Sequence, residues 1–167
     1  MKRTPLKRKT PLRAKTPLQK KRAKPRRKAK RDTVPSLRRK LDRVFSEYIR
    51  RRDANHSLSG AAKCCSCYRP FHWTIMDAGH YIKRGKAATR YDERNVHAQC
   101  HWCNRFQDGA MPGYTLFLIR RYGPDIIETL YEKSTQEHKW RVTELRAQVA
   151  EYKAKLTELD AATMNTP

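Results

Sequence analysis

Residues 64–104 read CCSCYRPFHWTIMDAGHYIKRGKAATRYDERNVHAQCHWCN, and the cysteines in this stretch determine the fold. They form two Cys-x-x-Cys pairs, Cys64 with Cys67 and Cys100 with Cys103. Each pair places two thiolates on a tight turn, and two such turns together supply the tetrahedral four-sulfur shell that structural zinc prefers. A closed four-cysteine site has no open position for a substrate, so we expect this zinc to stabilise the fold and take no part in chemistry. Cys65 is then the spare cysteine, and buried cysteines without metal are the alternative.

Polar residues between and after the cysteine pairs indicate hydrolysis of phosphodiesters. With a divalent ion, that reaction needs a general base and oxygen ligands for the ion. His80 is the candidate base, while the carboxylate of Asp77 and the side-chain amide of Asn104 suit Mg²⁺. Asn95 is expected to fix the backbone or the ring around His80. Residues three apart in a strand point to opposite faces, so Asp77 and His80 can converge only through a bulge, which Gly79 would permit.

Several residues of this stretch also have a plainer interpretation. Asn95 and Asn104 are residue types common in turns and at helix caps. We expect His101 to be structural or exposed. We expect the tryptophans to lie in the core, although an exposed tryptophan can stack on an unpaired base; they are Trp73, Trp102 and Trp140.

A basic loop follows the candidate base, and we expect it to contact DNA phosphates beside His80. A solvated loop without such contacts is the alternative. The expected DNA-binding residues, one of them beyond the second cysteine pair, are Lys83, Arg84, Lys86, Arg90 and Arg105.

The whole chain has 39 Lys and Arg against 16 Asp and Glu, a formal net charge of +23. Residues 1–31 contain 16 of the basic residues and no acidic residue, which leaves +7 for residues 32–167. A Thr-Pro-Leu motif, at residues 4–6, 10–12 and 16–18, prevents a regular helix there. We therefore expect a disordered basic arm that binds nucleic acid. A solubilising tail or an acidic protein partner is the alternative.

The sequence argues against several classes of function. No stretch approaches 18 apolar residues, and no apolar run follows the basic N-terminus, so we expect neither a membrane span nor a secretory signal. We therefore expect a cytoplasmic protein. The charge argues against an enzyme with a small neutral substrate, because so basic a chain needs a polyanionic partner.

Helical patterns flank the cysteine-rich stretch. Apolar spacing predicts an amphipathic helix from Ser36, as its N-cap, to about Asp53, with a basic face that either touches phosphate or is solvated. Two short helices are expected over 114–122 and 124–133, the second beginning at Pro124. A longer helix over about 139–159 has a heptad stripe that packs on the chain's own core or, as a hypothesis, forms a homodimer. The expected divisions are an arm (1–34), a helix and linker (35–62), a zinc-bound core (63–113), a helical region (114–160) and a tail (161–167).

The order of the motifs resembles a known class of nucleases. The elements C-x2-C, D-x-x-H and N-x-H-x-x-C-x-x-C-N follow one another as in HNH, or ββα-metal, endonucleases, with Asn104 in place of the usual last histidine. Phage recombination endonuclease VII has similar elements. The run from Cys64 to Asn104, with Asp77-Ala78-Gly79-His80-Tyr81 and Glu93-Arg94-Asn95-Val96-His97, is more specifically similar to the phage lambda NinG (Rap) recombination nuclease family. The likeness covers about residues 36–160 and leaves out the arm.

This resemblance implies an α+β fold with a small zinc-stabilised ββα-metal core between helices. It implies a DNA endonuclease that cuts branched recombination intermediates, Holliday junctions and D-loops, with Mg²⁺ or Mn²⁺. It places structural zinc on the four paired cysteines, the base on His80, the catalytic ion on Asp77 and Asn104, and an orienting role on Asn95.

One departure from the family pattern and three other functions stay open. Most HNH sites have a metal ligand directly before the base, where this chain has Gly79. His97 is an alternative ligand for the ion or an alternative contact for a phosphate. The other functions are a zinc-ribbon DNA-binding module without catalysis, an HNH homing or restriction nuclease that cuts linear duplex, and a basic RNA-binding protein. The set Asp77, His80 and Asn104 argues against the first and the third. Nothing in the residues themselves encodes a preference for branched over linear DNA.

Overall fold

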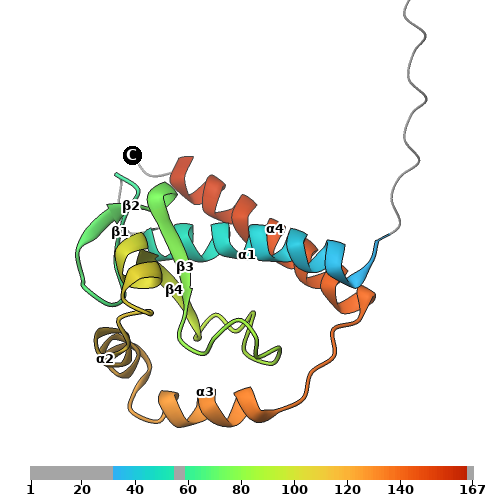
Figure 1. The fold of residues 1–167 in the computed structure, drawn as a ribbon. Coiled ribbons are helices and arrows are strands. Elements are labelled where there is room, and N and C mark those ends of the chain that lie inside the picture. The colour runs from blue at the N-terminus through green and yellow to red at the C-terminus, as the bar shows by residue number, and fades with distance from the viewer. Residues whose placement is uncertain (1–31, 55–58, 165–167) are drawn as a thin grey trace, which may run out of the picture. The chain divides into compact units, whose positions relative to one another are not determined.

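The computed structural model describes residues 32–54 and 59–164, which form a mixed α and β fold (Figure 1). The basic arm falls almost wholly outside the described residues, as does part of the predicted linker. In chain order the elements are α1 (Val34–Ala54), β1 (Ala61–Lys63), β2 (Pro70–His72), η1 (Trp73–Ile75), β3 (Met76–His80), β4 (Val96–Cys100), η2 (Trp102–Phe106), α2 (Met111–Tyr122), α3 (Ile126–Thr135) and α4 (Val142–Met164). In the part of the chain that the structure describes, no helix has the length and apolar composition needed to cross a membrane.

Helices α1 and α4 pack side by side and form the largest core cluster (Figure 1). The predicted apolar face of α1 is buried, and Leu41 and Ile49 are fully inaccessible to solvent. This face meets Leu145, Val149 and Tyr152 of the predicted heptad stripe in α4. The stripe therefore packs on the chain's own core, as one of the two predictions states. A homodimer through α4 stays a prediction, and it would have to use other residues of the helix.

Helix α1 begins at Val34, two residues before the predicted N-cap. The backbone N–H of Ser36 donates to Oγ1 of Thr33 (3.3 Å), and the N–H of Thr33 donates to Oγ of Ser36 (3.0 Å). These reciprocal bonds are the capping-box arrangement with Thr33 as N-cap. The prediction that Ser36 is the N-cap is wrong, because Pro35 is tolerated inside the first turn, where backbone N–H groups have no helical partner.

Two separate antiparallel hairpins contain the cysteine pairs. Strands β1 and β2 flank the first pair, and β4 ends at Cys100 of the second. Strands β3 and β4 pair one to one, from Met76 opposite Cys100 to His80 opposite Val96. The β3–β4 ladder therefore lacks the bulge that we expected to bring Asp77 and His80 together, and that prediction is wrong.

Gly79 permits close packing and not a bulge. A Cβ atom at this position would lie 2.1 Å from Oε1 of Gln99. Gln99 is buried, and its amide nitrogen donates to Oγ of Ser66 and to the carbonyl of Gly109, both at 2.6 Å. The glycine thus leaves room for the side chain that connects the β3–β4 hairpin to the first cysteine turn.

Helices α2 and α3 occupy the positions of the two predicted short helices. α3 begins at Ile126, however, so the prediction that Pro124 is its first residue is wrong. Pro124 lies in the preceding turn, which closes where the N–H of Ile126 donates to the carbonyl of Gly123 (3.4 Å). Gly123 has a φ of 91° and ends α2, so the direction of the chain changes before α3 starts.

Helix α2 packs directly on both hairpins. A Cβ atom on Gly113 would lie 2.1 Å from the carbonyl oxygen of Ser66, so the helix backbone touches the first cysteine turn. The buried hydroxyl of Tyr114 donates to the carbonyl of Gly79 (2.8 Å). The cysteine turns, the β3–β4 hairpin and α2 therefore form one packed unit.

Candidate functional site

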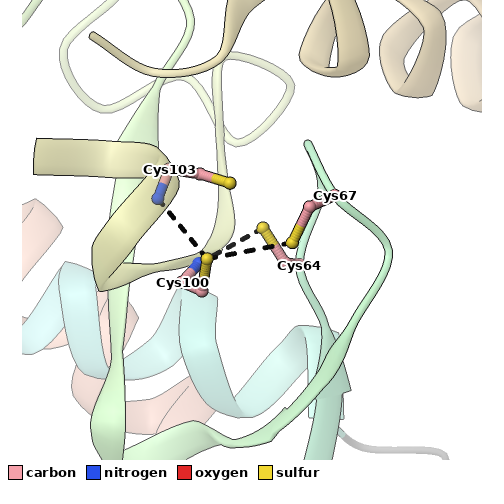
Figure 2. A group of neighbouring side chains, drawn as sticks. All are labelled: Cys64, Cys67, Cys100 and Cys103. Atoms are coloured by element: carbon pink, nitrogen blue, oxygen red, sulfur yellow. Dashed lines mark hydrogen bonds between the residues drawn. The ribbon is translucent and has the colours of Figure 1, made fainter. Parts of the chain in front are cut away.

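Four sulfur atoms meet between the β1–β2 turn and the start of η2 (Figure 2). The Sγ atoms of the two predicted cysteine pairs all lie within 4.8 Å of one another, and those of Cys67 and Cys100 are 3.9 Å apart. A tetrahedral zinc ion with Zn–S bonds of ~2.3 Å requires sulfur atoms about 3.8 Å apart. The four cysteines are thus placed to hold a zinc ion. In the described ranges they are the one such group of histidine, cysteine and acidic side chains.

The thiol of Cys64 is poised to ionise. A hydrogen bond from the Cys65 thiol, and further bonds from backbone N–H groups that include that of Cys100, lower its pKa to about 4 despite burial. The thiolate is the form of cysteine that binds metal. Cys65 itself lies outside the sulfur cluster and packs in the core with Tyr114, as expected of the spare cysteine.

A second polar cluster surrounds Asp77. Its Oδ2 accepts hydrogen bonds from Nδ2 of Asn104 (3.0 Å) and Nε of Arg105 (3.2 Å), and lies 3.1 Å from Nδ1 of His101. The side chains of His101 and Arg105 are more than half exposed, so the cluster is open to solvent. Burial alone would raise the pKa of Asp77, but the bonds from Asn104 and Arg105 lower it, which keeps the group a carboxylate. We call these four residues the Asp77 cluster.

The Asp77 cluster has the donor atoms of a site for a hard divalent ion. Carboxylate and amide oxygens are ligands that Mg²⁺ and Mn²⁺ prefer. Asn104 turns its amide nitrogen toward Asp77, and half a turn of the amide group would present its oxygen. The structure thus brings together the two predicted ligands. It adds His101, which contacts Asp77. The side chain of His101 is 52% exposed, which confirms the expectation that it is structural or exposed.

His80 lies on the other side of the β3–β4 hairpin. Three residues of a strand span roughly 10 Å, and within the described residues the ring of His80 bonds to Ala78 and Arg90 and not to the Asp77 cluster. The ring lines a groove of about 410 Å³ between β3 and α1, in which the basic side chains are Arg39, Arg43, Arg50 and Arg84. His80 is therefore close to several basic side chains and to Asp42, and it is separated from the Asp77 cluster.

Backbone carbonyls hold the imidazole of His80. Nε2 lies 3.0 Å from the carbonyl oxygen of Arg90, and Nδ1 lies 3.3 Å from that of Ala78. A neutral ring has one N–H and can donate to only one of these two carbonyls, so the other nitrogen keeps a lone pair that can accept a proton. Burial lowers the pKa of His80 to about 4, and the charge of Arg84 acts in the same direction. The ring is thus neutral at pH 7, the form that a general base requires.

Asn95 fixes the loop that follows His80. Its Oδ1 accepts the N–H of Ile82 (2.7 Å), and its Nδ2 donates to the carbonyls of Ile82 and Thr89, both at 3.0 Å. The side chain is fully buried. Of the two expected contacts, backbone or ring, the structure has the backbone contact.

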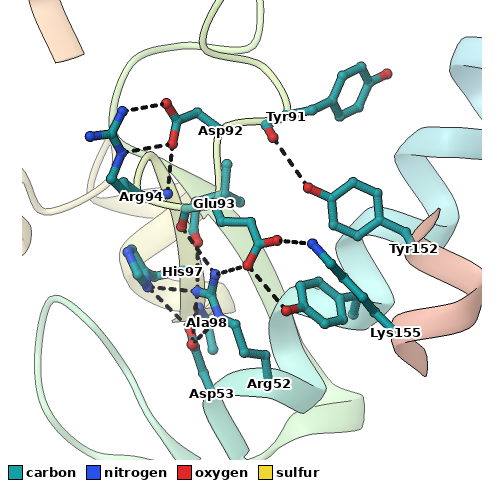
Figure 3. Close-up of polar contacts among 12 residues, drawn as sticks. Arg52, Asp53, Tyr91, Asp92, Glu93, Arg94, His97, Ala98, Tyr152 and Lys155 are labelled. Atoms are coloured by element: carbon teal, nitrogen blue, oxygen red, sulfur yellow. Dashed lines mark hydrogen bonds and ion pairs between the residues drawn. The ribbon is translucent and has the colours of Figure 1, made fainter. Parts of the chain in front are cut away.

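His97 belongs to a separate buried network (Figure 3). Its Nδ1 lies 3.0 Å from Nη2 of Arg52 and 3.4 Å from Oδ2 of Asp53. Burial lowers the pKa of His97, and although burial would raise that of Asp53, its bond to His97 and the charge of Arg52 lower it to about 2. The alternative of His97 as an ion ligand is wrong, because this fully buried ring joins the end of α1 to β4 and does not reach the Asp77 cluster.

The predicted DNA-binding residues differ in exposure. Arg90 is largely covered, and its guanidinium donates to both carboxylate oxygens of Asp42 (3.0 and 2.7 Å) and to the carbonyl of Arg84 (2.9 Å). The prediction that Arg90 contacts phosphate is wrong, because its donors are engaged and only 12% of its side chain is exposed. The exposed members of the set are Lys83, Arg84, Lys86 and Arg105.

The groove beside His80 also contains residues that the sequence did not connect with it. Arg39, Arg43 and Arg50 belong to the basic face of α1, for which phosphate contact and solvation were both open. Because α1 lies against β3, this face meets His80, which is thirty or more positions later in the chain. The basic face of the helix could be recognised in the sequence. Its position beside His80 could not, because that depends on how α1 packs on β3.

Comparisons with known proteins agree with one another. The family model described as Bacteriophage Lambda NinG protein matches residues 1–162. Over 124 residues the chain is 34% identical to protein ninG of Escherichia phage 933W, covering 72% of this chain and 57% of that protein. Over the same length it is 32% identical to protein ninG of Escherichia phage lambda, covering 72% and 56%. The chain thus spans a little more than half the length of these relatives. No solved structure matches it.

Proposed function

Because this chain belongs to the NinG family of bacteriophage proteins, we propose that it acts in phage recombination as a metal-dependent endonuclease on branched DNA. The Asp77 cluster carries the proposal, since it offers ligands for a hard ion at a partly exposed position on a cysteine-held hairpin. The order of hairpin, cysteine pair and Asn104 supports an HNH-like core. The proposal places its action on phage DNA in the cytoplasm of the bacterial host.

In the proposed reaction, the chain's own residues supply a base and a cradle for the DNA. The neutral imidazole of His80 takes a proton from a water molecule while the oxygen of that water attacks the phosphorus. The carbonyl of Arg90 orients the ring, and Asn95 fixes the loop between them. A divalent ion held by Asp77 and Asn104 would stabilise the negative charge of the transition state and the leaving oxygen.

The substrate would have to cross an edge of β3, because His80 and the Asp77 cluster lie on opposite faces of this strand. Among the described strands β3 pairs with β4 alone, so its outer edge is free of a strand partner there. At that edge Nη1 of Arg50 donates to the carbonyl of Met76 (3.4 Å). A phosphodiester placed over the edge would have the ion ligands on one side and the base on the other.

A zinc-held DNA-binding protein without catalysis is the second candidate. The regular register of β3 and β4 favours it, because within the described residues no hydrogen bond joins the candidate base to the candidate ion ligands. This candidate predicts that DNA is bound and not cut.

A cleavage assay separates the two candidates. The full chain is incubated with a synthetic four-way junction or a linear duplex of the same sequence, with and without Mg²⁺ or Mn²⁺. We expect ion-dependent cutting of the junction, reduced at least ~100-fold by Asp77→Ala and by His80→Ala, with binding retained. His138→Ala, which removes a partly exposed imidazole elsewhere, is the matched control. Equal cutting of both substrates would contradict branch preference, and binding without cutting by wild type would favour the second candidate.

A further inference from the structure

An exposed aromatic pair lies on η2. The side chains of Trp102 and Phe106 are 58% and 64% exposed, and their rings stack with centroids 5.3 Å apart and planes 27° from parallel. Trp73 and Trp140 are half-buried. The expectation that the tryptophans lie in the core is therefore wrong for Trp102. Exposing two stacked aromatic rings costs hydrophobic free energy, so the pair calls for an explanation.

The position of this pair beside the Asp77 cluster suggests its use. Asn104 and Arg105, which both contact Asp77, lie between Trp102 and Phe106 in the same short helix. The ring of His101 lies 5.9 Å from that of Phe106. A strand with a phosphate at the Asp77 cluster would therefore bring its bases next to the aromatic rings.

The exposed cation on η2 and the net positive charge of residues 32–167 favour a planar partner attached to a polyanion. The side chain of Arg105 is 60% exposed, and residues 32–167 have a net charge of +7. Buried Cys103 holds the inner side of the helix within the sulfur cluster. The rings are thus presented by an anchored turn, and a base added to the outer ring would extend an existing stack.

We propose that Trp102 and Phe106 form a stacking platform for unpaired nucleobases of DNA held at the Asp77 cluster. Every base has a π-face, so the platform is indifferent to sequence. Bases in a continuous duplex are already stacked and would have to be extruded, whereas bases at a branch point or in a single strand are available. This inference rests on the proposed function and deepens it. It names two residues that would make the protein prefer branched DNA over linear duplex.

The test measures binding without cutting. Fluorescence anisotropy with the zinc-loaded full chain, in Ca²⁺, gives Kd for a forked DNA with an unpaired arm and for a linear duplex of the same sequence. 2-Aminopurine at the branch point reports stacking directly. The variants are Trp102→Ala and Phe106→Ala, with Trp102→Phe as a conservative replacement. Tyr131→Ala is the matched control, because Tyr131 is 53% exposed on α3.

We expect Trp102→Ala and Phe106→Ala each to weaken binding of the forked DNA roughly 5- to 150-fold and to leave duplex binding within about twofold. Trp102→Phe should retain most of the affinity, and wild type should quench the 2-aminopurine. If both alanine variants bound both DNAs with unchanged affinity, the proposal would be overturned. The aromatic pair would then be a candidate contact for a protein partner. An equal loss on fork and duplex, or an equal loss in Tyr131→Ala, would also overturn the proposal.

Zinc content and the melting temperature of each variant establish that the fold is intact. The outcome is separable from that of the proposed function. If wild type cuts no DNA but Trp102→Ala still loses fork binding selectively, the endonuclease is refuted and the platform stands. If wild type cuts junctions and Trp102→Ala binds the fork normally, the platform is refuted and the endonuclease stands.

Discussion

The two faces of the β3–β4 hairpin have different chemistry. On one face Asp77 collects an amide, an imidazole and a guanidinium at an exposed position. On the other, His80 is neutral and set among arginines of α1. In the proposed function, one face would hold the divalent ion and the other would supply the base. Strand alternation causes this division, since positions 77 and 80 must point opposite ways in an unbulged strand.

Loss of the zinc ion should have the largest effect, because it should unfold the hairpin and so disrupt both of its faces. Structural zinc contributes on the order of 10 kcal/mol to folding in zinc-finger peptides, comparable with the ~5–15 kcal/mol stability of a whole domain. Cys100→Ser, or a strong chelator, should therefore abolish cooperative unfolding in circular dichroism melts. Cys65→Ala should keep one zinc per chain, because Cys65 lies outside the sulfur cluster. A melting curve insensitive to chelation would contradict a structural metal.

The next effect should separate the two faces. In a Mn²⁺ titration of junction cutting, Asp77→Ala should raise the half-saturating ion concentration at least ~10-fold, since it removes an ion ligand. His80→Ala should leave that concentration unchanged and lower the rate at saturating ion. If His80→Ala also raised the half-saturating ion concentration, the two faces would not have the distinct roles assigned to them.

The pH dependence of cutting tests the His80 face. Because the pKa of His80 is lowered to about 4, its base form stays fully populated as pH falls from 8 to about 6. Activity should be lost only as pH falls further, through the folded pKa, and not near the ordinary histidine value of about 6.5. Single-turnover rates between about pH 3.5 and 8 measure this, because that range includes the folded pKa. A midpoint near 6.5 would contradict the assignment of His80 as the base.

The smallest expected effect concerns the groove around His80. Arg39→Gln combined with Arg43→Gln should weaken junction binding modestly and reduce the slope of log Kd against log salt by about 2, since each phosphate that an arginine neutralises adds roughly 0.9 to the slope. Arg141→Gln combined with Lys153→Gln removes the same charge from the α4 region and should change the slope little. Equal changes in the two double variants would mean that the groove has no special part in binding.

The sequence predicted those features that depend on local spacing. The cysteine pairs predicted the sulfur cluster, and helical periodicity predicted α1 and α4 with their buried faces. Asp77 and Asn104 were predicted to share a site, and their side chains are 3.0 Å apart. These features were predictable because each follows from the spacing of apolar residues in a helix or from a set of residue types that suit one metal ion.

Features that depend on a distant neighbour could not be predicted. Arg90 looks like any loop arginine until Asp42 of α1 is placed beside it. His97 looks like a ligand until α1 ends on β4 and places Asp53 against its ring. The exposure of Trp102 depends on which side of η2 the cysteines anchor. Each outcome follows from packing between elements that are far apart in sequence.

The contact between Gly79 and Gln99 makes two positions of the hairpin interdependent. Any side chain at position 79 would occupy the space of the Gln99 amide, whose nitrogen holds the first cysteine turn. A relative with an acidic ligand directly before the base should therefore have a smaller residue at the position of Gln99 and another connection to that turn. The two positions should covary across homologues, and chains that keep the Gly79–Gln99 pair should depend on the acid at position 77.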